Sequence, residues 1–80
     1  MDTHEVVIDR IRNLMNERGW TENKLATESA VPQKTINSIF NHKSVNTGIL
    51  TIKKLCDAFE ITLGEFFTTK EFDNLEQEIQ

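Results

Sequence analysis

Two short helical patterns joined by a tight connection constrain the fold of this chain most strongly. They occupy residues 21–43, and the connection is Ser29-Ala30-Val31-Pro32. Proline is tolerated in the first turn of a helix, so we expect the second helix to begin at Pro32. Two short helices joined this closely must cross at a steep angle. The sequence therefore predicts a helix-turn-helix unit, with the other segments packed around it.

The second of these helices, running from Gln33 to Asn41, has two chemically different faces. When successive residues are turned by about 100°, the apolar side chains gather on one side and the polar ones on the other. The apolar side contains Ile36, Ile39 and Phe40, with Thr35 at its border. The polar side contains Gln33, Lys34, Asn37, Ser38 and Asn41, and no acidic residue. Amides both donate and accept hydrogen bonds, as the edge of adenine requires, and lysine donates to guanine. The polar face is suited to reading DNA bases, and an ordinary solvated helix face is the alternative.

The length and composition of the chain exclude several classes of protein. Its 80 residues make one small domain, in which a large enclosed active site is not expected. No paired carboxylates, phosphate-binding loop or metal-ligand cluster stands at a convincing spacing, so we expect neither an enzyme nor a cofactor, metal or small-molecule ligand. The chain has no long apolar span and no signal-peptide pattern, so no membrane partner is expected. The single cysteine, Cys56, favours a reducing cytoplasm.

The distribution of charge is uneven along the chain. The net charge of −4 argues against a nucleic-acid partner when it is taken alone. Between Ser29 and Cys56, however, there is no acidic residue, and this segment carries Lys34, Lys43, Lys53 and Lys54. It therefore has a charge of +4, while the rest of the chain has a charge of −8. A local field of one sign can orient a protein on a polyanion, although four lysines can also cluster by chance.

Helical spacing of apolar residues predicts three further helices of the core. They lie near residues 5–18, 49–59 and 61–67. We expect Gly19 to end the first of them in the left-handed conformation and Thr21 to cap the helix that follows.

Several single residues carry more specific expectations. Trp20 is expected in the core rather than as a stacking platform for a base. Asn46 or Thr47 is expected to cap the helix near residue 49, and Ile49 is expected on its buried stripe. Thr62 and Glu65 match a capping box at the start of the helix near residue 62.

Residues 68–80 have the pattern of an acidic amphipathic helix. Thr68 and Glu71 repeat the capping pattern at its start. Its apolar residues recur three and four apart: Phe72, Leu75 and Ile79. Such a stripe must be covered by its own domain or by a partner, so packing on the same chain and self-association are both open.

The order and spacing of these patterns resemble the lambda-repressor-like helix-turn-helix family, the Cro and xenobiotic-response-element type regulators of phages and bacteria. The resemblance runs from about Ile8 to Phe67. It rests on Ile11-x-x-Leu14, Gly19-Trp20-Thr21, Leu25-Ala26, Val31-Pro32-Gln33-Lys34-Thr35-Ile36, Thr51-Ile52-Lys53-Lys54-Leu55 and Phe59-x-Ile61-Thr62-Leu63-Gly64-Glu65-Phe66. It implies an all-α fold, a compact five-helix DNA-binding bundle in residues 1–67, followed by a short C-terminal helix in residues 68–80 that is a possible dimerisation element.

The resemblance also implies which residues contact DNA. Base contacts are expected from Gln33, Lys34, Asn37 and Ser38. Phosphate contacts are expected from Thr21, Asn23, Thr35, Asn41 and Lys43. Phosphate contacts fix the register of the protein on the duplex, whereas base contacts choose the sequence.

Two residues depart from the family pattern. Ala30 stands where the family usually has glycine, at a turn position that often needs a positive φ. Alanine in that conformation costs on the order of 1 kcal/mol. Glu22 replaces an uncharged residue that can touch a phosphate, and a carboxylate would be repelled there.

The leading hypothesis from the sequence is a sequence-specific DNA-binding transcriptional regulator, acting as a repressor. It would be a cytoplasmic homodimer that binds double-stranded DNA with the helix at residues 33–41 in the major groove. The alternative is a protein-interaction module or an antitoxin that keeps the helix-turn-helix fold. Glu22, the acidic total and the stripe in residues 68–80 motivate that alternative.

Overall fold

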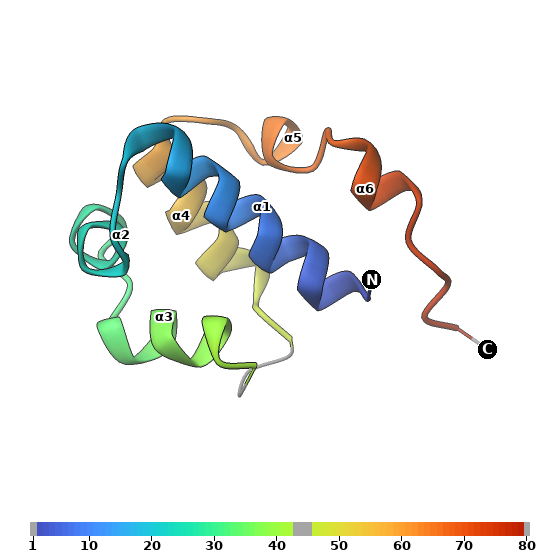
Figure 1. Ribbon diagram of the computed structural model, residues 1–80, viewed down its shortest axis with the longest axis horizontal. Helices are drawn as coiled ribbons and strands as arrows, with labels where there is room; N and C mark the ends of the chain where they lie inside the picture. Colours follow the sequence, from blue (N-terminus) through green and yellow to red (C-terminus); the bar gives the residue numbers. More distant parts are fainter. Residues whose placement is uncertain (1, 43–45, 80) are drawn as a thin grey trace.

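Six helices make up the described part of the protein, a computed structural model that describes residues 2–42 and 46–79. They are α1 (Thr3–Arg18), α2 (Glu22–Ser29), α3 (Gln33–Phe40), α4 (Ile49–Phe59), α5 (Leu63–Phe66) and α6 (Lys70–Asp73). Within these two ranges there is no strand, and the predicted all-α class is confirmed. In Figure 1, α3 lies along the lower edge of the molecule, α5 and α6 lie along the upper edge, and α1 runs between them. No helix in the described ranges is both long enough and apolar enough to cross a membrane.

The hydrophobic core is built from the apolar faces that helical spacing predicts. Leu25, Ile36, Leu55 and Phe66, from four different helices, are each 0% exposed. Burying a side chain of this size stabilises the folded chain by about 1.5–3 kcal/mol. Trp20, which was expected in the core, is half-buried and packs against it, stacking on Phe59 with 5.3 Å between the ring centroids.

The ends of the first helices and of α5 are fixed by local hydrogen bonds that the sequence predicts. Gly19 ends α1 in the left-handed conformation, with φ of 65°. The hydroxyl of Thr21 caps α2 by accepting the N–H of Lys24 at 3.1 Å. Thr62 and Glu65 form the predicted capping box of α5. These capping bonds satisfy backbone groups that the helix itself leaves without partners.

The start of α4 differs from the prediction. Its N-cap is Gly48, so neither Asn46 nor Thr47 caps it. The prediction for Ile49 was also wrong, because this side chain is 56% exposed. The rest of α4 packs against α2 and α5. Ile49 is the first residue of α4 and lies outside this packed region.

The helix predicted over residues 68–80 forms only one turn, α6. Its N-cap is Thr69, which makes no side-chain capping bond, so the capping pattern at Thr68 and Glu71 is not used. Phe72 packs against the core, with its ring centroid 4.9 Å from that of Phe67. Ile79, in contrast, is 85% exposed. A short helix gains its stability from an apolar face that is covered, and here only the first residue of the stripe is packed against the core.

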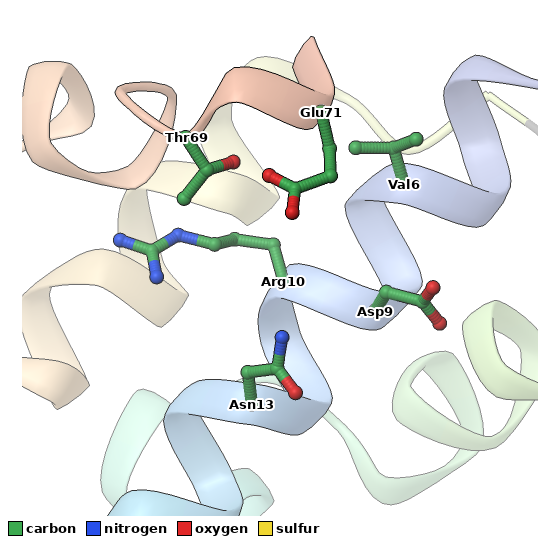
Figure 2. A pocket seen from close by; sticks show the side chains of 6 residues that line it. All are labelled: Val6, Asp9, Arg10, Asn13, Thr69 and Glu71. Atoms are coloured by element: carbon green, nitrogen blue, oxygen red, sulfur yellow. The ribbon is translucent and has the colours of Figure 1, made fainter.

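Arg10 ties the middle of α1 to the end of α5. Its Nε donates to the carbonyl oxygen of Phe66 at 2.8 Å, and Nη2 donates to that of Glu65 at 2.8 Å. Figure 2 shows its side chain extended from α1 past Thr69 and Glu71 of the neighbouring segment. Carbonyl groups at a helix end lack intrahelical partners, so this contact satisfies two of them and fixes where α5 sits.

Candidate nucleic-acid interface

The turn between α2 and α3 is held by backbone geometry and one side chain. Ala30 keeps the left-handed conformation, with φ of 58° and ψ of 23°, although it has a Cβ atom. The Ser29 hydroxyl donates to the carbonyl of Leu25 at 2.7 Å and accepts the N–H of Val31 at 3.2 Å. Val31 is then buried in the core. The direction in which α3 leaves α2 is therefore fixed by three consecutive residues.

The inner face of α3 is buried and its outer face is not. Ile36 is 0% exposed and Ile39 is 2% exposed, and both belong to the core. On the outer face, Lys34 and Asn37 are exposed, and Gln33 and Ser38 are half-buried. No other labelled helix lies below α3 in Figure 1. The four residues predicted to read bases therefore lie together on one accessible face of a short helix.

Two of these outer side chains are hydrogen-bonded to each other. Nε2 of Gln33 donates to Oδ1 of Asn37 at 3.3 Å. Gln33 keeps one N–H and its carbonyl oxygen for another partner, and Asn37 keeps both N–H groups. Adenine presents one donor and one acceptor in the major groove, which matches the pair of groups left on Gln33.

The beginning of α3 is electropositive. Pro32 is its N-cap and makes no side-chain capping bond, and its first turn contains no acidic residue. The first backbone N–H groups of a helix have no partner within the helix, and the helix dipole adds a partial positive charge there. The ammonium group of Lys34 lies in the same turn. This end of α3 is therefore suited to approach a polyanion.

The beginning of α2 carries two of the predicted phosphate contacts. Thr21 and Asn23 are both exposed. The Thr21 hydroxyl oxygen accepts the capping bond from Lys24, so its proton remains available to donate to a phosphate oxygen. Glu22 lies between them and is half-buried, which places a carboxylate at the same helix end. The nearby amine of Lys24 is paired with Glu28 at 2.9 Å.

Of the other predicted phosphate contacts, Thr35 lies in the first turn of α3 and Asn41 lies at its far end. Asn41 is exposed, Thr35 is half-buried, and Lys43 lies outside the described residues. The structure adds a cation that sequence reasoning missed, because the guanidinium carbon of Arg12 lies 4.9 Å from the ring centroid of Phe40. Such a contact stabilises a cation over an aromatic face, and the C-terminal end of a helix also favours positive charge. No sequence spacing links residues 12 and 40, so only the packing of α1 beside α3 reveals it.

Hollows elsewhere on the described surface are small or open. One of about 110 Å³ lies between α1 and the α6 segment, lined by Val6, Asp9, Arg10, Asn13, Thr69 and Glu71 (Figure 2). Arg10 uses its guanidinium there for the backbone of α5. Among the described residues, no group of three or more His, Cys, Asp or Glu is placed to hold a metal ion.

Comparison with known proteins places this geometry in a family. A family model of the Cro/C1-type HTH DNA-binding domain matches residues 10–71, which include the whole of α2 and α3. The chain is also similar to the prophage Lp1 protein 11, known from a crystal structure, with a TM-score of 0.81 and 29% sequence identity. That similarity covers 94% of this chain and 100% of the prophage protein. Comparison with curated proteins gave no match.

Proposed function

The chain belongs to the Cro/C1-type helix-turn-helix DNA-binding family, and from this premise we propose that it is a sequence-specific transcriptional regulator. In this proposal α3 enters the major groove of double-stranded DNA and the protein represses transcription by occupying its operator. The observation that carries the proposal is the outer face of α3, which is accessible, free of acid and rich in amides.

The roles of the outer residues follow from their hydrogen-bonding groups. Gln33 offers one donor and one acceptor to adenine, and Lys34 offers donors to guanine. Ser38 and Asn37 complete the base-reading face. Phosphate contacts at both ends of the interface fix the register of α3, and they come from Thr21, Asn23, Thr35, Asn41 and Lys43.

The size of the chain favours a homodimer on a two-fold operator. An eight-residue helix such as α3 is about 12 Å long and reaches only a few base pairs. Dimers of this motif read two half-sites about 34 Å apart, one turn of the duplex. The whole chain measures 38 × 25 × 20 Å, so two copies side by side can present their α3 helices at that spacing.

Duplexes selected from a random pool provide the test. We expect the full chain to bind the selected duplexes, with affinity that falls steeply as the salt concentration rises, because phosphate contacts release counterions. Gln33→Ala should reduce the preference for the selected base by about 1–3 kcal/mol. Asn23→Ala should weaken binding to all duplexes alike, and Asn16→Ala, on the exposed side of α1, serves as the control. Selection that yields no sequence preference and no salt-dependent binding would refute the proposal.

A further inference from the structure

Two adjacent aliphatic side chains at the start of α4 are exposed. Ile49 is 56% exposed and Leu50 is 75% exposed, whereas the buried side of the same helix packs against α2 and α5. One turn further on, Lys53 and Lys54 are also exposed. Residues one turn apart on a helix share a face, so these four residues form one surface, which we call the α4 patch.

Among the described residues, the third exposed large aliphatic residue lies in the acidic tail, residues 74–79. Ile79 is 85% exposed, and Glu76 and Glu78 beside it are exposed as well. The carboxylate of Glu78 accepts a hydrogen bond from the Thr3 hydroxyl at 2.8 Å, which holds the tail near the beginning of α1. Both ends of the chain lie at the same side of the molecule in Figure 1. Because Ile79 is 85% exposed and Leu50 is 75% exposed, the two side chains do not cover each other within one chain.

The two surfaces carry opposite charges. The start of α4 has Gly48 as its cap, no capping side chain and no acidic residue in the first turn, so its field is positive. Lys54 adds to that field, while Lys53 is paired with Asp57 of the same helix. The tail adds the carboxylates of Glu76 and Glu78. Contact between two α4 patches would bring charges of the same sign together, whereas contact between a tail and an α4 patch brings opposite charges together.

We propose that the acidic tail of one copy docks on the α4 patch of a second copy, and that the second tail docks on the first patch in return. Ile79 then contacts Ile49 and Leu50, and Glu76 approaches Lys54. A two-fold exchange makes each contact twice and closes the dimer. The inference rests on the homodimer of the proposed function, and it names the surfaces that form it without using α3.

Sedimentation equilibrium on the full chain, from micromolar to millimolar concentration and without DNA, tests this interface. We expect a monomer–dimer equilibrium whose dissociation constant rises roughly ten- to hundredfold in Leu50→Asp and also in Ile79→Asp, because each variant removes a buried aliphatic side chain from the contact. Asn16→Asp adds the same charge at an exposed site on α1 and should leave the constant unchanged. Both aliphatic side chains are exposed in the single chain, so the circular dichroism spectra of the variants should match that of the unchanged protein.

Charge reversal tests which surfaces meet. Lys54→Glu and Glu76→Lys should each weaken the dimer, and the two substitutions together should restore it. A chain that stays monomeric at every concentration overturns the inference. So does a dimer whose dissociation constant is unchanged by Ile79→Asp, or a double variant whose dimer is no stronger than that of the single variants. DNA binding is measured separately on a duplex with a single half-site. Salt-dependent binding there by Leu50→Asp supports the proposed function whatever the dimer does.

Discussion

The side-chain amide of Gln33 donates a hydrogen bond to the side-chain oxygen of Asn37, one turn further along α3, across 3.3 Å. This bond sets which way the Gln33 amide faces on the outer surface of the helix. It leaves one N–H donor and the carbonyl acceptor of Gln33 free, together with both N–H donors of Asn37. We therefore propose that the two residues act as one base-reading unit, in which Asn37 positions Gln33.

Replacing Asn37 tests this coupling. Asn37→Ala should reduce the preference for adenine opposite Gln33 by about 1 kcal/mol, because the amide of Gln33 is no longer held. Asn37→Asp keeps an accepting oxygen in the same place, so it should keep the preference while it weakens binding to every duplex through repulsion of phosphates. Competition between duplexes that differ at a single base pair measures the preference. Equal losses on all duplexes in Asn37→Ala would show that the bond does not direct base choice.

The left-handed conformation of Ala30 predicts a stabilising substitution. Ala30→Gly removes the Cβ that makes φ of 58° unfavourable, and it should raise the free energy of unfolding by about 0.5–1 kcal/mol. Ala58→Gly, inside α4, should lower it by a similar amount, because glycine is a poor helix former. Urea denaturation of the two variants measures both effects. A destabilised Ala30→Gly would mean that the turn does not hold this conformation in solution.

The first five helices could be predicted because each has an apolar stripe that a neighbouring helix covers. Residues 68–80 were predicted to form a helix from the same kind of stripe. The helix ends at Asp73, so the prediction was wrong beyond that residue. Phe72 packs against Phe66 and Phe67, whereas Ile79 is 85% exposed and is not covered by the part of the chain that the structure describes. Spacing alone does not say whether a stripe will find a partner, and this depends on the fold.

The outer face of α3 could be predicted because a helix places residues on its faces at a fixed angle. Lys34 and Asn37 lie on that face as expected. Contacts between distant segments could not be predicted, since the stacking of Arg12 on Phe40 depends on how α1 meets α3. The roles of Lys34 and Asn37 in DNA binding remain predictions.

The fluorescence of Trp20 can distinguish a structural role beside Phe59 from a role as a stacking platform for a DNA base. Trp20 is the only tryptophan, the chain has no tyrosine, and its ring stacks on Phe59 at an angle of 25°. We expect its emission to shift to longer wavelength when urea unfolds the chain, because the ring then enters water. Addition of a duplex that the protein binds should leave the tryptophan emission nearly unchanged. Strong quenching by the duplex would indicate base stacking on Trp20 instead.

Burial of Cys56 predicts a dependence of stability on alkaline pH. Burial raises the pKa of its thiol above the ordinary value of 9.0. The unfolded chain therefore loses this proton at a lower pH than the folded chain does. The stability that the neutral thiol contributes is complete below the unfolded pKa and is lost as the pH rises through the folded pKa.

Urea denaturation of the unchanged protein and of Cys56→Ala, compared from pH 7 to above pH 9.0, isolates this effect. The difference in free energy of unfolding between the two proteins should shrink as the pH rises, because other titrating groups are common to both. A constant difference would show that the thiol titrates alike in both states.

Backbone amide chemical shifts of the isotope-labelled full chain, recorded during titration with a selected duplex, test the central claim most directly. We predict that the largest shifts fall on Gln33, Lys34, Asn37 and Ser38, with smaller ones at Thr21 and Asn23. Largest shifts on α4 and α6, with α3 unchanged, would contradict the claim that the outer face of α3 reads DNA.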